Sequence, residues 1–134
     1  RRMIDFTAPI APVAKGRPRV TNKNGQVRTH TPPKTAKFEK ALAVFCPADP
    51  ISGPVSLTLT FGIPIPVSWS KRKRGQALEG IVRPISRPDI DNYEKAVMDA
   101  ITGLAYHDDS QVVAKTARLI YSDEPFVRVV VLRC

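Results

Sequence analysis

The chain has 134 residues, of which 21 are Lys or Arg and 12 are Asp or Glu, so its formal net charge is +9. This length allows one domain with a substantial core but not two, and we expect a single domain over residues 1–134. The positive charge indicates a polyanionic partner, and because neither a membrane-spanning run of about 18 apolar residues nor a signal-peptide core is present, we expect a cytoplasmic protein without a membrane partner.

The N-terminal residues predict a strand followed by a basic hairpin. Residues 3–8 alternate apolar and polar side chains, which is typical of a half-buried strand. Residues 17–29 predict a short hairpin that turns at Asn24 and Gly25, because these residue types readily adopt positive φ. The Arg and Lys residues of this hairpin have no apolar surface to cover. We therefore interpret it as a flap that contacts DNA.

A helix and a strand follow the hairpin. The helix is expected to begin with Thr31 as its N-cap and Pro at its first position, and to end before Pro47. Its apolar residues recur at helical spacing (Phe38, Ala41, Leu42, Phe45). Residues 55–63 alternate apolar with small or polar side chains and form the clearest predicted strand. The two cysteines, Cys46 and Cys134, lack zinc-site spacing and are expected to be reduced thiols.

Residues 64–88 lose all periodicity and are expected to form a long loop. A loop of this length inside a small domain indicates either function or disorder. Within it, Trp69 precedes the basic run Lys71, Arg72, Lys73 and Arg74. This combination suits phosphate contact with base stacking on the indole. The alternative is a solvated, mobile loop with Trp69 tucked beneath it.

The last third of the chain predicts a helix and two strands. Apolar residues between Tyr93 and Leu104 follow a helical rhythm that Gly103 ends, and Asp91 with Glu94 resembles a capping box in which Asp91 is the N-cap. Residues 111–121 and 126–133 predict two strands that close the chain as a hairpin. The order of elements favours an α+β domain, with a mostly antiparallel sheet and two main helices packed on one face.

Acidic residues gather around this last helix. Six of the twelve fall within 21 residues: Asp89, Asp91, Glu94, Asp99, Asp108 and Asp109. Crowded carboxylates repel one another unless a cation compensates them. Mg²⁺ is the simplest compensation, because it binds one or two carboxylates together with phosphate oxygens.

Three of these carboxylates can meet at the start of the helix. Asp89 and Asp91 precede it, and Asp109 can return to them if residues 103–109 run back nearly extended along the helix; otherwise it must come from a second subunit. Together they could hold one or two Mg²⁺ ions, with Lys95 donating to the scissile phosphate.

Structural alternatives remain open for the same residues. Asp89 and Asp91 also suit helix capping, and Asp108 with Asp109 also suits a turn before a strand. Lys95 and Asp99 also suit an ion pair on a solvated helix face.

Three separated motifs of the chain resemble the RusA family of Holliday junction resolvases. They are Arg87-Pro88-Asp89-Ile90-Asp91-Asn92, Lys95-Ala96-Val97-Met98-Asp99-Ala100 and Asp108-Asp109-Ser110-Gln111-Val112. Residues 15–19, 31–32 and 64–70 are similar to the bacterial and prophage branch of that family. The resemblance extends over residues 4–132.

This resemblance implies a Mg²⁺-dependent crossover junction endodeoxyribonuclease, with Mn²⁺ as a possible substitute. It implies a homodimer that nicks two strands of a four-way DNA junction symmetrically in recombination and repair, in a bacterial or prophage-encoded, nucleoid-associated protein. Asp89, Asp91 and Asp109 match the catalytic, metal-holding aspartates and Lys95 the essential lysine, while Asp108 matches an acidic neighbour counted among the metal-binding residues.

The residues expected to contact DNA are basic or aromatic. They are Lys15, Arg17, Arg19, Trp69, Lys71, Arg72, Lys73, Arg74 and Arg87. Two other interpretations compete with the nuclease. One is a non-catalytic, basic nucleic-acid-binding module, a degenerate resolvase. The other takes Asp89 and Asp91 as the D-x-D motif of a glycosyl- or phosphotransferase, but residues 82–88 lack the buried strand that should precede it.

Overall fold

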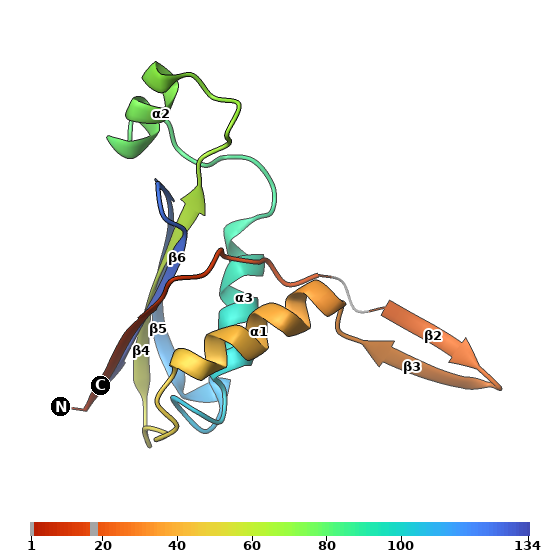
Figure 1. Ribbon diagram of the computed structural model, residues 1–134. Helices are drawn as coiled ribbons and strands as arrows, with labels where there is room; N and C mark the ends of the chain where they lie inside the picture. Colours follow the sequence, from red (N-terminus) through yellow and green to blue (C-terminus); the bar gives the residue numbers. More distant parts are fainter. Residues whose placement is uncertain (1, 17–18) are drawn as a thin grey trace.

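The computed structural model describes residues 2–16 and 19–134, and it contains a four-stranded sheet with two helices across one face (Figure 1). The sheet is formed by β1 (Met3–Ala8), β4 (Val55–Pro64), β5 (Val112–Ser122) and β6 (Phe126–Arg133), and the helices are α1 (Pro33–Phe45) and α3 (Ile90–Ile101). The remaining elements are β2 (Arg19–Lys23), β3 (Gln26–His30), α2 (Lys71–Leu78) and the 3₁₀ turn η1 (Asp109–Gln111). The expected α+β class, with a mostly antiparallel sheet, is confirmed.

The strand order β1-β6-β4-β5 corrects the expected C-terminal hairpin. Both strands exist at the expected positions, but β4 lies between them, antiparallel to β6 and parallel to β5. A parallel neighbour needs a crossover connection, and the chain between β4 and β5 supplies one that contains α2 and α3. The apolar residues of β4 are buried along its length, so this strand takes the centre of the sheet.

The core lies between the sheet and the pair α1 and α3. The face of α3 toward the sheet buries Tyr93, Ala96, Val97 and Ile101, as the helical rhythm predicted. The Tyr93 ring packs at 5.5 Å, centroid to centroid, from Phe61 on β4. Within the described part of the chain, no helix has the length and apolar character needed to cross a membrane.

Both predicted helix starts need correction. Helix α1 has Pro32 rather than Thr31 at its N-cap position. Helix α3 has Asp89 at its N-cap position, and Asp91 lies inside the first turn, so the capping box of Asp91 and Glu94 is wrong. Glu94 does not reach back to the start of the helix because its carboxylate pairs with Lys115 of β5 at 3.1 Å.

The segment expected to be a long loop contains the helix α2. Ser70 caps it, since its hydroxyl accepts a hydrogen bond from the Lys73 backbone N–H at 3.2 Å. Only Ala77 of α2 is buried, which explains why the sequence shows no apolar periodicity over this helix. Trp69 packs edge-on against Tyr121 at 5.1 Å and carries the Lys73 ammonium 4.0 Å from its ring centre. The indole is therefore tucked against β5, as the alternative expected.

A glycine in β4 allows the Phe126 ring to lie on the sheet. A Cβ atom at Gly62 would sit 2.3 Å from the Phe126 ring, its neighbour in register on β6. We expect Gly62→Ala to lower the free energy of unfolding by about 1–3 kcal/mol, because a methyl group cannot fit beside the ring. Denaturant titration followed by circular dichroism measures this loss.

Two further variants identify the cause. In a Phe126→Ala background the same Gly62→Ala change should cost less, because the clashing ring is gone. Gly75→Ala on α2, where nothing lies within 4 Å of the new Cβ, should be neutral or stabilise by up to about 1 kcal/mol. An equal loss for Gly62→Ala in both backgrounds would contradict the steric argument.

The two thiols differ in accessibility. Burial raises the pKa of the Cys46 thiol to about 11, whereas Cys134 is exposed. Because only the thiolate reacts, we expect one thiol per chain to react with a disulfide reagent at pH 8, and two after denaturation. Cys134→Ser should remove the fast reaction, and a fast reaction that survives this change would contradict the burial of Cys46.

Candidate active-site groove

A groove of about 300 Å³ separates α3 from the start of β5. Its lining is almost entirely charged: Asp91, Glu94, Lys95, Met98, Asp99, Asp109 and Lys115. The five residues from α3 recur at spacings of three and four, so they form one stripe of the helix surface. Asp109 comes from η1 and Lys115 from β5. The groove therefore collects charges from three elements of the chain.

Asp109 reaches the groove by a route that differs from the expected one. Residues 103–108 do not run back extended along α3: Gly103 has φ +87°, and its N–H donates to the Tyr106 carbonyl at 2.7 Å. Asp109 consequently lies beside Met98, in the later half of α3. Asp91 and Met98 are seven residues apart, which corresponds to about 10 Å along the helix. Asp91 and Asp109 both line this groove.

A small network of hydrogen bonds fixes the turn that carries Asp109. The Gln111 side-chain oxygen accepts from the backbone N–H groups of His107 and Asp108 at 2.7 and 2.9 Å, and its amide nitrogen donates to the carbonyls of Ile51 and Gly53 at 2.8 Å each. The Asp108 carboxylate accepts from the Ser110 hydroxyl at 2.5 Å. This hydrogen bond lowers the pKa of Asp108. Asp108 therefore caps the turn locally.

Asp89, a predicted metal ligand, does not line the groove. Asp89 lies in a neighbouring hollow between Pro88 and Ile90, lined also by residues 83–86 and Leu119. Over residues 2–16 and 19–134, no group of three His, Cys, Asp or Glu side chains has the arrangement of a metal site. The structure thus brings Asp91, Lys95 and Asp109 to one groove and leaves Asp89 beside it.

Lysines neutralise much of the acidity of the groove. Lys115 pairs with Glu94, whose side chain is only 14% exposed. Asp99 pairs with Lys15 at 2.9 Å, so the alternative pairing of Asp99 with Lys95 is wrong. Lys95 remains exposed in the groove, one turn after Asp91.

Lys15 joins three parts of the chain. Its ammonium lies 2.8 Å from Glu39 of α1 and 2.9 Å from Asp99 of α3, and its side chain is 15% exposed. Burial alone would lower the pKa of Lys15, but its hydrogen bonds to Glu39 and Asp99 outweigh burial and raise the pKa. The charge of Lys15 is thus engaged inside the protein, which differs from the expected contact with DNA.

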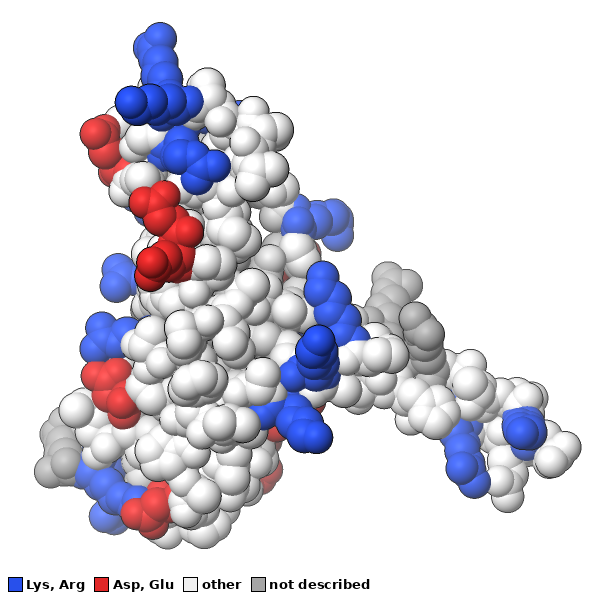
Figure 2. All heavy atoms as spheres, in the orientation of Figure 1, with Lys and Arg blue, Asp and Glu red and all other residues white. Residues whose placement is uncertain are grey.

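The other residues expected to contact DNA lie on or near α2, at the hairpin β2–β3, and in the segment before α3. Lys71, Arg72 and Lys73 are exposed on α2, whereas Arg74 is half-buried and donates to the Pro66 carbonyl at 3.3 Å. Figure 2 shows Lys and Arg side chains over α2 and along the hairpin.

The remaining members of the expected DNA-contact set are three arginines. Arg87 is exposed just before α3 and Arg19 begins β2, while Arg17 lies outside the described residues.

Sequence reasoning missed the pair formed by Glu94 and Lys115. Glu94 was assigned to a cap, and Lys115 was not singled out. A signal existed for Lys115, since it shares its face of β5 with Ala117 and Leu119, which pack against the core. A lysine in register with core-facing residues is a candidate for a buried ion pair.

Two comparisons place the chain among known proteins. The model of the family described as Endodeoxyribonuclease RusA matches residues 9–132. Uncharacterized protein YqaN of Bacillus subtilis (strain 168) is 42% identical over 134 residues, which cover 96% of this chain and 94% of that protein. The match includes the groove, its turn and the hairpin, and it confirms the resemblance seen in the sequence. The chain belongs to the RusA family of endodeoxyribonucleases.

Proposed function

We propose that the protein is a Mg²⁺-dependent endonuclease that resolves four-way DNA junctions by paired, symmetric nicks. Membership in an endodeoxyribonuclease family supports the hydrolysis of DNA. The net charge of +9 supports binding to a polyanion. The observation that carries the proposal is the groove that Asp91, Lys95 and Asp109 share.

The donor set of the groove fits a hard divalent cation. Its acidic side chains offer only carboxylate oxygens, which Mg²⁺ prefers, and Mg²⁺ commonly keeps several waters and binds through one or two carboxylates. In this proposal Asp91 and Asp109 of the groove, with Asp89 from the neighbouring hollow, would hold the metal, Asp108 supports the turn beside it, and Mn²⁺ could substitute. Once bound, the ion would supply an activated water and stabilise the leaving 3′-oxygen.

The lysines of the groove act on the phosphate. Lys95 is exposed one turn into α3, where its ammonium donates to a non-bridging oxygen and stabilises the charge that develops in the transition state. The first turn of α3 adds free backbone N–H groups that favour the same anion. Lys115 pairs with Glu94 at 3.1 Å, and its positive charge offsets the repulsion between this carboxylate and the phosphate.

A homodimer suits the proposed substrate. A four-way junction has two-fold symmetry, and a two-fold dimer places one groove on each of two cut strands. Sedimentation of the protein with and without junction DNA measures this stoichiometry.

A non-catalytic DNA-binding module is the second candidate. The observation in its favour is that, over residues 2–16 and 19–134, no three His, Cys, Asp or Glu side chains are arranged as a metal site. Both candidate functions require binding to branched DNA, but only the nuclease cleaves it.

We expect Asp91→Asn and Asp109→Asn each to reduce Mg²⁺-dependent cleavage of a synthetic four-way junction by at least about 100-fold, because each removes a charge from the metal site while keeping the side-chain shape. Binding at low salt should be retained or tightened, since a negative charge near the phosphate is lost. Gel assays of cleavage and binding on a junction and on a linear duplex measure both effects.

Asp49→Asn is the matched control, because Asp49 pairs with Arg2 away from the groove. It should leave cleavage unchanged. Wild-type protein that binds the junction but never cuts it with Mg²⁺ or Mn²⁺ would establish the binding module instead.

The basic helix α2 should contribute phosphate contacts. Replacing Lys71, Arg72 and Lys73 with alanine should lower the slope of log K against log salt by about 2–3, since each duplex phosphate contact contributes about 0.9. Arg74→Ala should leave the slope unchanged, because Arg74 already donates to the Pro66 carbonyl. A slope that the triple change does not alter would exclude α2 from the interface.

A further inference from the structure

The hairpin β2–β3 has two chemically different faces. Its register pairs Thr21 with Arg28 and Lys23 with Gln26, and because strand side chains alternate, these four lie on one face. Val20 and Val27 lie on the other face, each 66% exposed. Both strands project away from the sheet and its helices (Figure 1).

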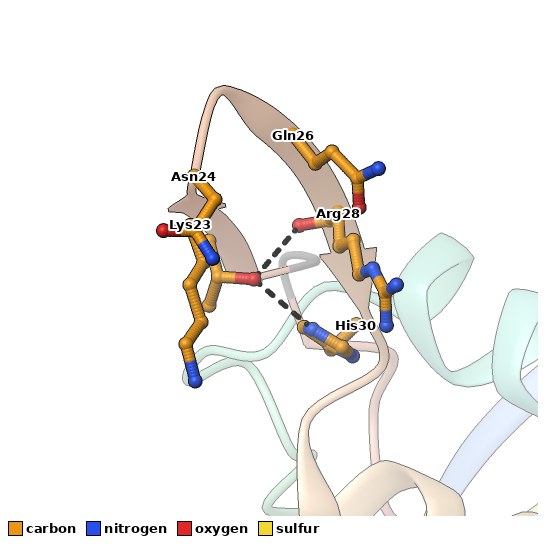
Figure 3. Close-up of a pocket in the computed structure, with 6 residues that line it drawn as sticks. Lys23, Asn24, Gln26, Arg28 and His30 are labelled. Atoms are coloured by element: carbon orange, nitrogen blue, oxygen red, sulfur yellow. Dashed lines mark hydrogen bonds between the residues drawn. The ribbon is translucent and has the colours of Figure 1, made fainter.

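The first face forms an open hollow of about 560 Å³, lined by Thr21, Lys23, Asn24, Gln26, Arg28 and His30. We call these six residues the polar face. The Thr21 hydroxyl organises it, donating to the Arg28 carbonyl at 3.5 Å and lying 3.1 Å from the His30 ring nitrogen, as the dashed lines in Figure 3 mark. Amide, hydroxyl, imidazole and cationic groups thus line one hollow with no carboxylate among them.

The sequence around the polar face carries basic residues and no acidic ones. No Asp or Glu occurs between residues 6 and 38 of the sequence, whereas seven Lys and Arg do. Every residue of β3 is exposed, so this strand contributes nothing to the core that would explain its composition. A cationic, hydrogen-bonding surface without a structural role fits a polyanion that also presents polar groups.

The dimensions of the hairpin match a groove of duplex DNA. Each strand has five residues, or about 16 Å at about 3.3 Å per residue. The major groove is about 12 Å wide and admits a two-stranded ribbon. Lysine and arginine pair with phosphates at the rim of such a groove, while glutamine and asparagine pair with base edges on its floor.

The base of the hairpin is tied to the helix that carries the groove. The Lys15 backbone N–H donates to the Asn92 carbonyl of α3 at 2.8 Å, and its ammonium pairs with Asp99. The next N–H, of Gly16, donates to the Thr35 hydroxyl of α1 at 3.1 Å. Lys15 and Gly16 are therefore held against α3 and α1, a few residues before β2 begins.

We propose that the polar face binds in the major groove of one duplex arm of the branched DNA, with Lys23 and Arg28 on phosphates and Asn24 and Gln26 on base edges. The opposite face, with Val20 and Val27, points away from that arm. This inference rests on the proposed function, because it takes the junction as the ligand. It adds a second contact, remote from the groove that cuts.

Neighbouring residues on opposite faces provide the first test. Gln26→Cys and Val27→Cys are introduced separately into protein that also carries Asp91→Asn and Cys134→Ser, and each new thiol receives a photoactivatable cross-linker. On a four-way junction, Gln26→Cys should cross-link to an arm with at least about five-fold the yield of Val27→Cys, since only position 26 faces the DNA. Equal yields, or none from position 26, overturn the proposal.

Salt dependence provides the second test. Lys23→Ala with Arg28→Ala should lower the slope of log K against log salt by about 1.8, the share of two phosphate contacts. Lys34→Ala with Lys37→Ala removes two exposed charges from α1 and should leave the slope nearly unchanged. Equal falls for both pairs would show an effect of overall charge and overturn the proposal.

The two levels of inference fail in different ways. Protein that carries Asp91→Asn and binds no junction at low salt contradicts the proposed function itself. Two results together would contradict only the role of the hairpin. One is tight junction binding by the Lys23→Ala, Arg28→Ala variant with the wild-type salt slope, and the other is no cross-link from the Gln26→Cys variant. Circular dichroism of each variant should match the parent, because the changed residues lie outside the core.

Discussion

The parallel pairing of β5 with β4 is the constraint on which the groove depends. If β5 had paired with β6 as a hairpin, it would not lie beside the acidic residues of α3. Parallel pairing instead obliges the chain to cross the sheet before β5 begins, and α3 lies on that crossover. The start of β5 and the turn before it consequently lie along α3, where Asp109 and Lys115 line one groove with Asp91 and Lys95.

The acidity of the groove is partly balanced by the protein itself. Four carboxylates (Asp91, Glu94, Asp99, Asp109) meet Lys95 and Lys115 in the lining, and Lys15 lies between Asp99 and Glu39. The four negative and two positive charges of the lining leave two net negative charges. Repulsion among the carboxylates favours a bound cation, and lysines relieve part of that repulsion. The remaining argument for Mg²⁺ is chemical: the donors are oxygens, and the substrate brings phosphate.

Local patterns predicted the elements better than their arrangement. Strand 126–133 and the positive-φ turn at Asn24 and Gly25 appear as expected, because alternation and turn chemistry act between close neighbours in the chain. Strand order was missed because a short connection after Ser122 looks like a hairpin until β4 is seen to need two partners. Helix α2 was missed because it buries a single alanine. Its other side chains are mostly charged or polar, so apolar residues do not recur at helical spacing.

In the candidate site, too, local patterns were predictable from the sequence and the arrangement in space was not. The sequence predicted that Asp91, Lys95 and Asp109 share a region, because two motifs flank one helix. It did not predict where Asp109 lies along α3, since that depends on the Gln111 side chain and its bonds to Ile51 and Gly53. The pair of Glu94 and Lys115 likewise depends on which strand runs beside α3.

The separation of the hairpin from the core bears on how such proteins diverge. Folding depends on the sheet and its two helices, and nothing in β3 is buried among them. Substitutions there escape the purifying selection that packing imposes on β4 or α3. In the proposed role of the hairpin, lineages could therefore change which DNA they hold through it, while inheriting an unaltered groove.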